Sequence, residues 1–254
     1  DVIQNLDFSV VSENILLDTN EFYGIGSVQY PFAGAFDFRG YHVTLNILNE
    51  YKNDYYELDA QSHTSIYSGL FGYVKGLENT SSMIKDVDVN GKIAFSGTTG
   101  NHGFYHYVGG IAGHVEPTTL LAGANSEVSI AIENDTPLFI GGLFGSLKSP
   151  LNDQFNFTYK CNYGVLQAKS HGSDVNMSLG ALTGILQDTY VYNFEDKSIS
   201  THIVANNLGS DNTPHDSGTA VVGGIAGTVY AGSKDIHIKN VKMNIAEDKN
   251  LSAL

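Results

Sequence analysis

Residues 86–97 carry oxygen ligands at the spacing of the first half of a calcium-binding EF-hand loop. The first, third and fifth positions are Asp86, Asp88 and Asn90, and a glycine follows at the sixth. The twelfth position, which requires a bidentate Glu, is Gly97, and no helix-forming sequence flanks the segment. We therefore favour a strand with a polar outer face over a calcium site.

Three histidines, His102, His106 and His114, lie close together in the sequence. Two histidines four residues apart can hold zinc when a helix brings them to one face, but this segment is rich in Gly and aromatic residues and leads into an expected strand. The lone Cys161 excludes an internal disulfide, and the alternating aromatic residues of 155–163 predict that its thiol is buried and inert in a half-buried strand. We predict no metal and no cofactor.

Residues 215–219, His-Asp-Ser-Gly-Thr, contain the residue types of a serine-protease triad and the Asp-Ser-Gly-Thr string of aspartic proteases. Adjacent residues cannot form a triad, because its members must converge from separate elements, and the string does not follow an apolar strand. We interpret residues 206–218 as a polar loop on the outside of the fold. The chain is predicted not to be an enzyme.

Two tyrosine-rich segments, residues 49–63 and 102–107, are extra length compared with the shortest repeat described below. Exposed rings beside Asp, Asn and His are typical of sites that hold sugars or partner proteins, since the ring stacks while the polar groups form hydrogen bonds. The alternative is that these rings cover the edges of the fold. The candidate binding residues are Tyr51, Tyr55, Tyr56, Phe104 and Tyr105.

The elements that position these residues are indicated by an internal repeat. Five octets, such as Val-Gly-Gly-Ile-Ala-Gly-His-Val, have Gly at the sixth position, and all but one also have Gly at the third. A repeat unit, measured from one octet to the next, is 32 to 43 residues long and cannot bury its apolar face alone, so neighbouring units must stack. The octets begin at Tyr67, Val108, Ile140, Leu179 and Val222, with spacings of 41, 32, 39 and 43 residues.

A second pattern recurs at residues 3–8, 84–89 and 238–243. Its third residue is Asn5, Asp86 or Asn240. Asn and Asp tolerate the left-handed backbone conformation, so these residues are expected at the corners of a coil.

The repeats, together with 28 Gly, 15 Tyr and 13 Phe, predict an all-β fold: a β-solenoid of about five to seven coils with loop insertions, formed as a single domain by residues 1–254. In the shortest unit we expect the octet, residues 118–125 and residues 126–133 to form three strands, broken near Pro117 and Asn125. Each coil then adds one strand to each of three parallel sheets. The octet glycines remove the Cβ atom where coils pack closely.

On these residues the chain resembles the bacterial GLUG-motif repeat family, whose Gly-Leu-x-Gly core stands here at residues 69–72 and 142–145. Residues 110–113 and 224–227 are relaxed versions, and the resemblance covers residues 1–245. It implies a right-handed parallel β-helix within large secreted or wall-attached proteins, including adhesin-like proteins and the non-catalytic regions of immunoglobulin A peptidases.

The amino-acid composition makes some classes of binding partner unfavourable. Thirteen basic residues face 27 acidic ones, and a net charge of -14 repels nucleic acid and anionic lipid. No apolar stretch approaches the length of a membrane span. The chain opens at Asp1 with neither Met nor a signal region, so we expect a segment of a longer secreted or surface protein.

The main functional hypothesis is a non-catalytic extracellular module of a bacterial surface or secreted protein, acting as a rigid spacer and as an adhesin for host or cell-surface proteins or glycans. One alternative is a carbohydrate-active β-helix enzyme: a polysaccharide lyase, for which Arg39 is the candidate base, or a glycoside hydrolase with paired carboxylates. Another is a structural subunit that self-associates end to end through unpaired strands.

Overall fold

In the computed structural model, the described part of the chain consists of strands and connecting turns without any helix, and thus without a helix able to cross a membrane. Apart from one short antiparallel pair, the strand pairs in these residues are parallel. The predicted all-β class with parallel sheets is confirmed. The structure describes residues 14–18, 23–39, 41–50, 57–58, 64–77, 82–97, 104–151, 157–170, 175–197, 202–207, 219–230, 237–239 and 241–242.

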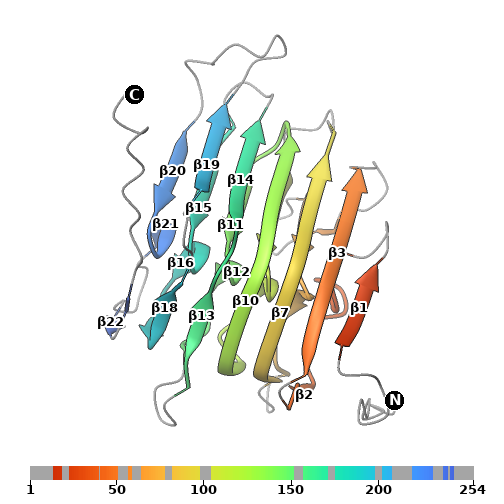
Figure 1. Cartoon of the computed structure of the whole chain (residues 1–254), viewed down its shortest axis with the longest axis vertical. Helices are drawn as coiled ribbons and strands as arrows, with labels where there is room; N and C mark the ends of the chain where they lie inside the picture. Colours follow the sequence, from red (N-terminus) through yellow and green to blue (C-terminus); the bar gives the residue numbers. More distant parts are fainter. Residues whose placement is uncertain are drawn as a thin grey trace.

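The largest sheet, called the long sheet here, lies across the face shown in Figure 1. Its strands alternate buried and more exposed residues, because successive side chains of a strand point to opposite faces. Its main path is β1 (Asn14–Asp18), β3 (His42–Glu50), β7 (Ser82–Ser96), β10 (Thr119–Asn134), β13 (Tyr159–Cys161) and β18 (Phe194–Asp196), joined by β2 (Ala35–Asp37), β14 (Val165–Ser170) and β19 (His202–Asn207).

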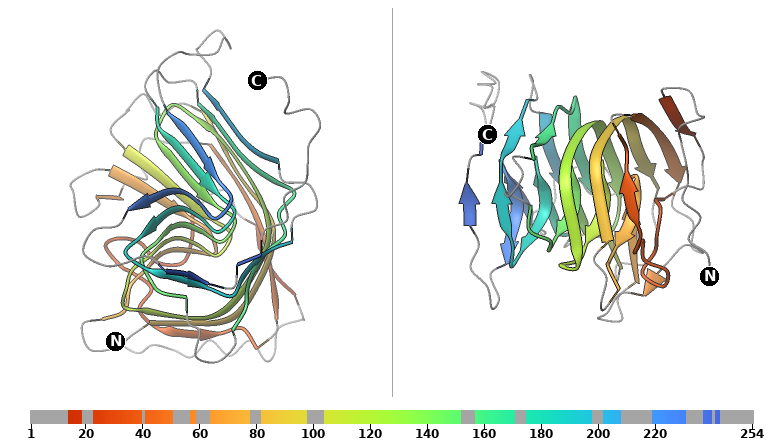
Figure 2. Two further views of the ribbon diagram at one scale, coloured as in Figure 1. Left: turned by 90° about the vertical axis from the view of Figure 1, so that its left-hand side faces the viewer. Right: turned by 90° about the horizontal axis from the view of Figure 1, so that it is seen from below.

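Two shorter sheets, called the first and second limbs, diverge from a shared line of bends (Figure 2). The first limb contains β4 (Glu57–Leu58), β5 (Thr64–Ser68), β8 (Phe104–Gly109), β11 (Leu138–Gly141), β15 (Met177–Gly180) and β20 (Ala220–Gly223). The second limb contains β6 (Phe71–Val74), β9 (Ala112–Val115), β12 (Phe144–Leu147), β16 (Thr183–Gln187) and β21 (Ala226–Tyr230). A separate pair joins β17 (Tyr190–Tyr192) to β22 (His237–Lys239).

Each glycine octet supplies one strand to each limb, and the bend between the limbs lies inside it. In the second limb Phe71 pairs with Ala112, Ala112 with Phe144, Phe144 with Thr183, and Thr183 with Ala226. These partners are 41, 32, 39 and 43 residues apart, which are the spacings of the octets in the sequence. The five octets therefore lie one above another, and we number these levels rungs 1 to 5.

Two sequence-based expectations about the strands are wrong. An octet forms two strands instead of one, because its third and fourth residues turn the chain between the limbs. Residues 119–134, expected to break near Asn125, form the single strand β10. The chain bends instead at Gly123, whose φ is +86°, while Ala122 and Ala124 on either side keep their pairing to β7.

Left-handed residues mark a corner in the long sheet. Asp86 has a φ of +50° and lies on β7 opposite Gly123 of β10. The strand pairs on either side of them are Lys85 with Ala122 and Val87 with Ala124. Asn193, with a φ of +53°, directly precedes Phe194, which aligns through Tyr159 with the same corner. The predicted corner at Asp86 is confirmed. The corners predicted at Asn5 and Asn240 lie outside the described residues.

The core lies between the long sheet and the two limbs. Phe95 of the long sheet packs edge-on against His106 of the first limb, with ring centroids 4.7 Å apart, and Phe38 packs edge-on against Phe71 of the second limb at 6.5 Å. Cys161 is fully buried, as predicted, and its thiol contacts Asp196 Oδ1 at 3.4 Å. The largest fully buried side chains are Tyr159, Phe71, Phe95, Phe144, Phe194, Leu45, Ile47, Ile84, Ile93, Ile111 and Leu121.

Candidate functional site

The outer faces of the two limbs enclose a groove of about 720 Å³ that extends over all five rungs. The limbs are closest at the octet bends and separate away from them (Figure 2). In β8, Tyr105 and Tyr107 face this groove, while His106 and Val108, which alternate with them, are buried in the core. Strand alternation thus gives one face of each limb to the core and the other to the groove.

A ladder of aromatic rings follows the first-limb wall of the groove. Tyr67 on rung 1 stacks on Tyr107 on rung 2, with ring centroids 5.1 Å apart and planes 9° apart. Tyr107 stacks in turn on Phe139 on rung 3, at 4.9 Å and 17°. The centroid spacing matches the distance between neighbouring strands, because parallel in-register pairing places these side chains directly above one another.

The opposite wall carries a second, shorter stack. Tyr73 of β6 lies on His114 of β9 with ring centroids 4.7 Å apart, and His114 meets Tyr107 edge-on across the groove at 6.3 Å. On rungs 1 and 2 the bottom of the groove is therefore filled by rings.

Glu116 is held at the groove by two hydrogen bonds and one ion pair, all to the same oxygen. Tyr73 donates its hydroxyl to Oε1 at 2.6 Å, His114 Nε2 lies 3.2 Å from it, and Lys148 Nζ lies 3.9 Å from it. Within the described residues, the hydrogen bonds and ion pairs of the Glu116 carboxylate all involve Oε1 and none involves Oε2. The carboxylate is thus fixed in orientation with one oxygen available as an acceptor.

The charges of this cluster follow from its burial and contacts. Burial opposes ionisation of Glu116, but the hydrogen bonds from His114 and Tyr73 and the nearby positive charges outweigh it and lower the pKa of Glu116 to about 2. Burial lowers the pKa of His114 below its usual value, although Glu116 acts in the opposite direction. At neutral pH Glu116 is therefore ionised and His114 neutral, and Lys148 balances the carboxylate.

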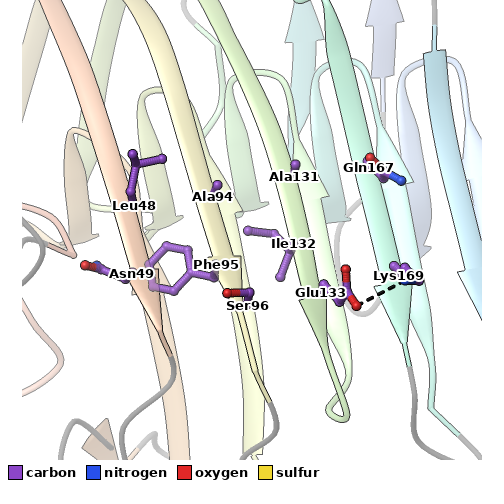
Figure 3. Close-up of a pocket in the computed structure, with 10 residues that line it drawn as sticks. All are labelled: Leu48, Asn49, Ala94, Phe95, Ser96, Ala131, Ile132, Glu133, Gln167 and Lys169. Atoms are coloured by element: carbon purple, nitrogen blue, oxygen red, sulfur yellow. Dashed lines mark hydrogen bonds and ion pairs between the residues drawn. The ribbon is translucent and has the colours of Figure 1, made fainter. Parts of the chain in front are cut away.

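A second hollow, of about 410 Å³, lies on the outer face of the long sheet (Figure 3). Its surface is formed by short side chains, Ala94 and Ala131, beside the ion pair of Lys169 Nζ with Glu133 Oε1 at 3.1 Å. Phe95 also borders it but is only 2% exposed and belongs to the core. Because it offers no ring face to a ligand, the groove between the limbs is the better candidate site.

The predicted binding residues are only partly placed. Tyr51, Tyr55 and Tyr56 lie outside the described residues, and Phe104 is described only as the first residue of β8. Tyr105 is half-buried and lines the groove, with ring centroids 6.4 Å from Tyr107 and 5.8 Å from Phe139. Its place in the groove does not by itself identify Tyr105 as a ligand contact, so its role stays a prediction.

Sequence reasoning missed the ladder itself. Tyr67 is the first residue of its octet, where the other octets have Val, Ile or Leu, and octet alignment therefore places it in the core. The structure instead pairs Tyr67 with Tyr107, 40 residues later, while Phe71 of the same octet pairs with Ala112, 41 residues later. This one-residue slip turns Tyr67 to the groove.

The described candidate metal ligands do not form a common site. His106 points into the core, where its Nε2 lies 2.9 Å from Ser68 Oγ, whereas His114 faces the groove, and His102 lies outside the described residues. Asp88 contacts His42 and Asn125 on the long sheet. In the part of the chain that is described, no three His, Cys, Asp or Glu side chains are grouped as metal ligands.

The residues considered for catalysis are also separate from the groove. Arg39 lies in the turn before β3 with a φ of +49°, and its backbone N–H donates to Asp37 Oδ1 at 3.0 Å. Asn206 and Asn207, expected in the polar loop, are instead the last residues of β19, and residues 208–218 lie outside the described residues. Comparison of the chain with protein-family models, curated proteins and solved structures gives no match. The GLUG-repeat resemblance stays a prediction.

Proposed function

We propose that the chain is a right-handed parallel β-helix segment of a bacterial surface or secreted protein, and that it is a non-catalytic adhesin-type module that binds a glycan chain in the groove between its limbs. In-register stacking of the octets and the parallel sheets support the first part. The observation that carries the second part is the ring ladder of Tyr67, Tyr107 and Phe139 along an open groove.

The chemistry of the groove favours a neutral carbohydrate. Sugars present apolar C–H faces and hydroxyl groups, which suit aromatic rings and an oriented acceptor such as Glu116 Oε2. Glu116 and Lys148 balance each other, so the described groove has little local charge to attract an ion. The net charge of -14 further disfavours acidic polysaccharides.

A binding role is favoured over glycoside hydrolysis by the number of carboxylates. A hydrolase of the usual kind needs two Asp or Glu side chains flanking the bond. Among the described residues that line the groove, Glu116 is the one carboxylate, and its low pKa makes it a poor general acid. Release of reducing ends from neutral polysaccharides by the purified chain would favour the enzyme instead.

We expect the purified chain to bind neutral oligosaccharides on a glycan array, with little dependence on salt concentration. Glu116→Gln should weaken binding about tenfold, a loss of binding free energy on the order of 1 to 2 kcal/mol. An amide is a weaker acceptor than a carboxylate, and it places a donor where one of the two carboxylate oxygens was. Isothermal titration calorimetry on the best array ligand measures the change.

The matched control is Tyr190→Ala on β17, which removes a ring that is 36% exposed and does not line the groove. Binding should be unchanged in this variant. An array that stays blank for the wild-type chain contradicts glycan binding and leaves only the spacer role.

Self-association is a second candidate because core positions are uncovered on rung 5. Val222 and Val229 align with the buried Leu179 and Leu186 of rung 4 but are 50% and 52% exposed. A second copy that continues the sheets would cover them. Light scattering of the wild type and of Val222→Asp at high concentration tests this: association that the aspartate abolishes supports it, and monomers throughout contradict it.

A further inference from the structure

The groove changes character after rung 3. On the first-limb wall, Tyr67, Tyr107 and Phe139 are followed by Ser178, which pairs with Phe139 in the next strand, and then by Val221. The ring ladder therefore ends at Phe139. Stacking occupies the Phe139 face toward Tyr107, whereas toward rung 4 the paired residue is Ser178 instead of a ring.

The opposite wall changes one rung earlier. Tyr73 and His114 are followed by Ser146 on rung 3, Ile185 on rung 4 and Thr228 on rung 5. At these paired positions, shorter side chains thus replace rings on rungs 4 and 5 of the first-limb wall and on rungs 3 to 5 of the opposite wall. Because the fold holds the limbs at the same octet bends on every rung, the shorter side chains leave free space where rings fill rungs 1 and 2.

Polar groups border this space on several sides. The hydroxyls of Ser178 and Thr228 lie 2.7 Å apart and form a hydrogen bond between the walls. Ser178 Oγ also lies 2.9 Å from Gly184 O, so its position is fixed. Lys148 and Tyr230, farther from the bends, line the same groove, and Tyr230 is 55% exposed.

We propose that rungs 3 to 5 of the groove form a subsite for one neutral pyranose ring, which stacks on the face of Phe139 toward rung 4 and donates hydrogen bonds to the hydroxyl oxygens of Ser178 and Thr228. The rings of rungs 1 and 2 are then a support that holds Phe139 in place, and they do not themselves stack on the ligand. This inference rests on the proposed function, since it assigns the position and the chemistry of the sugar.

A ring-sized, neutral occupant is indicated by three features together. Phe139 offers a flat apolar surface, and the oxygens of the paired hydroxyls offer acceptor lone pairs for the hydroxyl groups of a sugar. Lys148 is already engaged by Glu116 instead of being free for an anion. A free phosphate or carboxylate ligand would require an unpaired cation, which the lining does not supply among its described residues.

The test uses the full chain and neutral oligosaccharides of glucose, galactose and mannose. Phe139→Ala should weaken the binding of the best of them at least tenfold, while Phe139→Trp should keep it or strengthen it. Because the chain contains no tryptophan, the indole of Phe139→Trp is a unique fluorophore in contact with the proposed sugar. Its emission should change and saturate as the oligosaccharide is added.

The outcomes separate this inference from the proposed function. If oligosaccharides bind the wild type, but Phe139→Ala binds equally well and the indole does not respond, the ligand lies elsewhere and the subsite is wrong while glycan binding stands. If no oligosaccharide binds the wild type, the proposed function fails and the subsite with it. Should Phe139→Ala fail to fold by circular dichroism, the indole titration alone decides, with Tyr190→Trp as the control that should not respond.

Discussion

Gly145→Ala is expected to destabilise the fold by more than about 4 kcal/mol, a large part of the total stability of most domains. Gly145 is the sixth residue of the rung 3 octet, where the second limb passes close to the first limb of the rung before it. A Cβ atom on Gly145 would lie 2.5 Å from the backbone nitrogen of Val108 and 2.6 Å from the carbonyl oxygen of Gly113. Both neighbours are main chain, so no side-chain rotation can relieve the overlap.

The same conflict arises on rungs 2, 4 and 5. A Cβ on Gly113 would lie 2.6 Å from the Ser68 nitrogen, and one on Gly184 would lie 2.6 Å from the Ile140 nitrogen. The invariant glycine of the repeat is therefore required by the close approach of the limbs.

Gly34→Ala is the matched control for the glycine experiment. Its added Cβ would meet only the ring of Phe32, at an ordinary contact distance of 3.6 Å, and its backbone is not left-handed. We expect a change within about 1 kcal/mol. Urea unfolding followed by circular dichroism compares the two variants with the wild type, and equal midpoints for all three would show that the limbs are not packed as described.

The second large effect is expected from pH, because His106 is a fully buried histidine in the core. Burial lowers the pKa of His106 to about 3. In the unfolded chain its pKa is near 6.5, so between these values the unfolded state binds a proton that the folded state does not. Stability is therefore unaffected above pH 6.5 and is lost as the pH falls below it. Between pH 6.5 and 4.5 we expect His106 to cost about 2 to 3 kcal/mol.

The strand pairing of the first limb suggests the variants that test the effect of His106 on stability. The residues aligned with His106 on the neighbouring rungs are Ile66, Leu138 and, one rung further, Met177. His106→Leu should remove the titration while filling the same space, and His106→Gln should remove it while retaining a partner for Ser68. In urea unfolding at pH 7, 6, 5 and 4.5, both variants should lose less stability than the wild type. His114 remains as a titrating group in all three proteins, so the difference between them reports His106.

An equal slope in the wild type and both variants would contradict this assignment. Glu116 does not alter the comparison of pH dependence between the wild type and the His106 variants, because its pKa shift affects stability mainly below pH 4.5.

Much of the architecture could be predicted because the same close packing of backbone recurs from rung to rung. The spacing of the octets equals the pairing offset of the second limb, since each sixth-position glycine must pass the same backbone. Asp86 was recognisable as a corner because few side chains tolerate a positive φ. These features depend on local backbone chemistry, which a residue type reports directly.

The groove could not be predicted, because it depends on where the octet folds. A run such as Val-Gly-Gly-Ile-Ala-Gly-His-Val reads equally well as one strand or as two, and only the two-stranded form creates a concave outer face. Tyr107 and Phe139 each stand one residue before their octet, at positions that alternate toward solvent, and nothing in their local sequence separates a groove from an exposed surface. Tyr67 was further hidden by the one-residue slip of β5.

The parallel register also bears on how the length of such a molecule can change. Val115 and Leu147 pair as equivalent positions on rungs 2 and 3, so excision of residues 116–147 joins the end of β9 to Lys148 at the place that Glu116 occupied. One complete level would disappear, and Tyr107 would then neighbour Ser178. Gain or loss of whole repeat units can therefore lengthen or shorten the groove and replace its polar residues, while the glycine bends on either side keep their geometry.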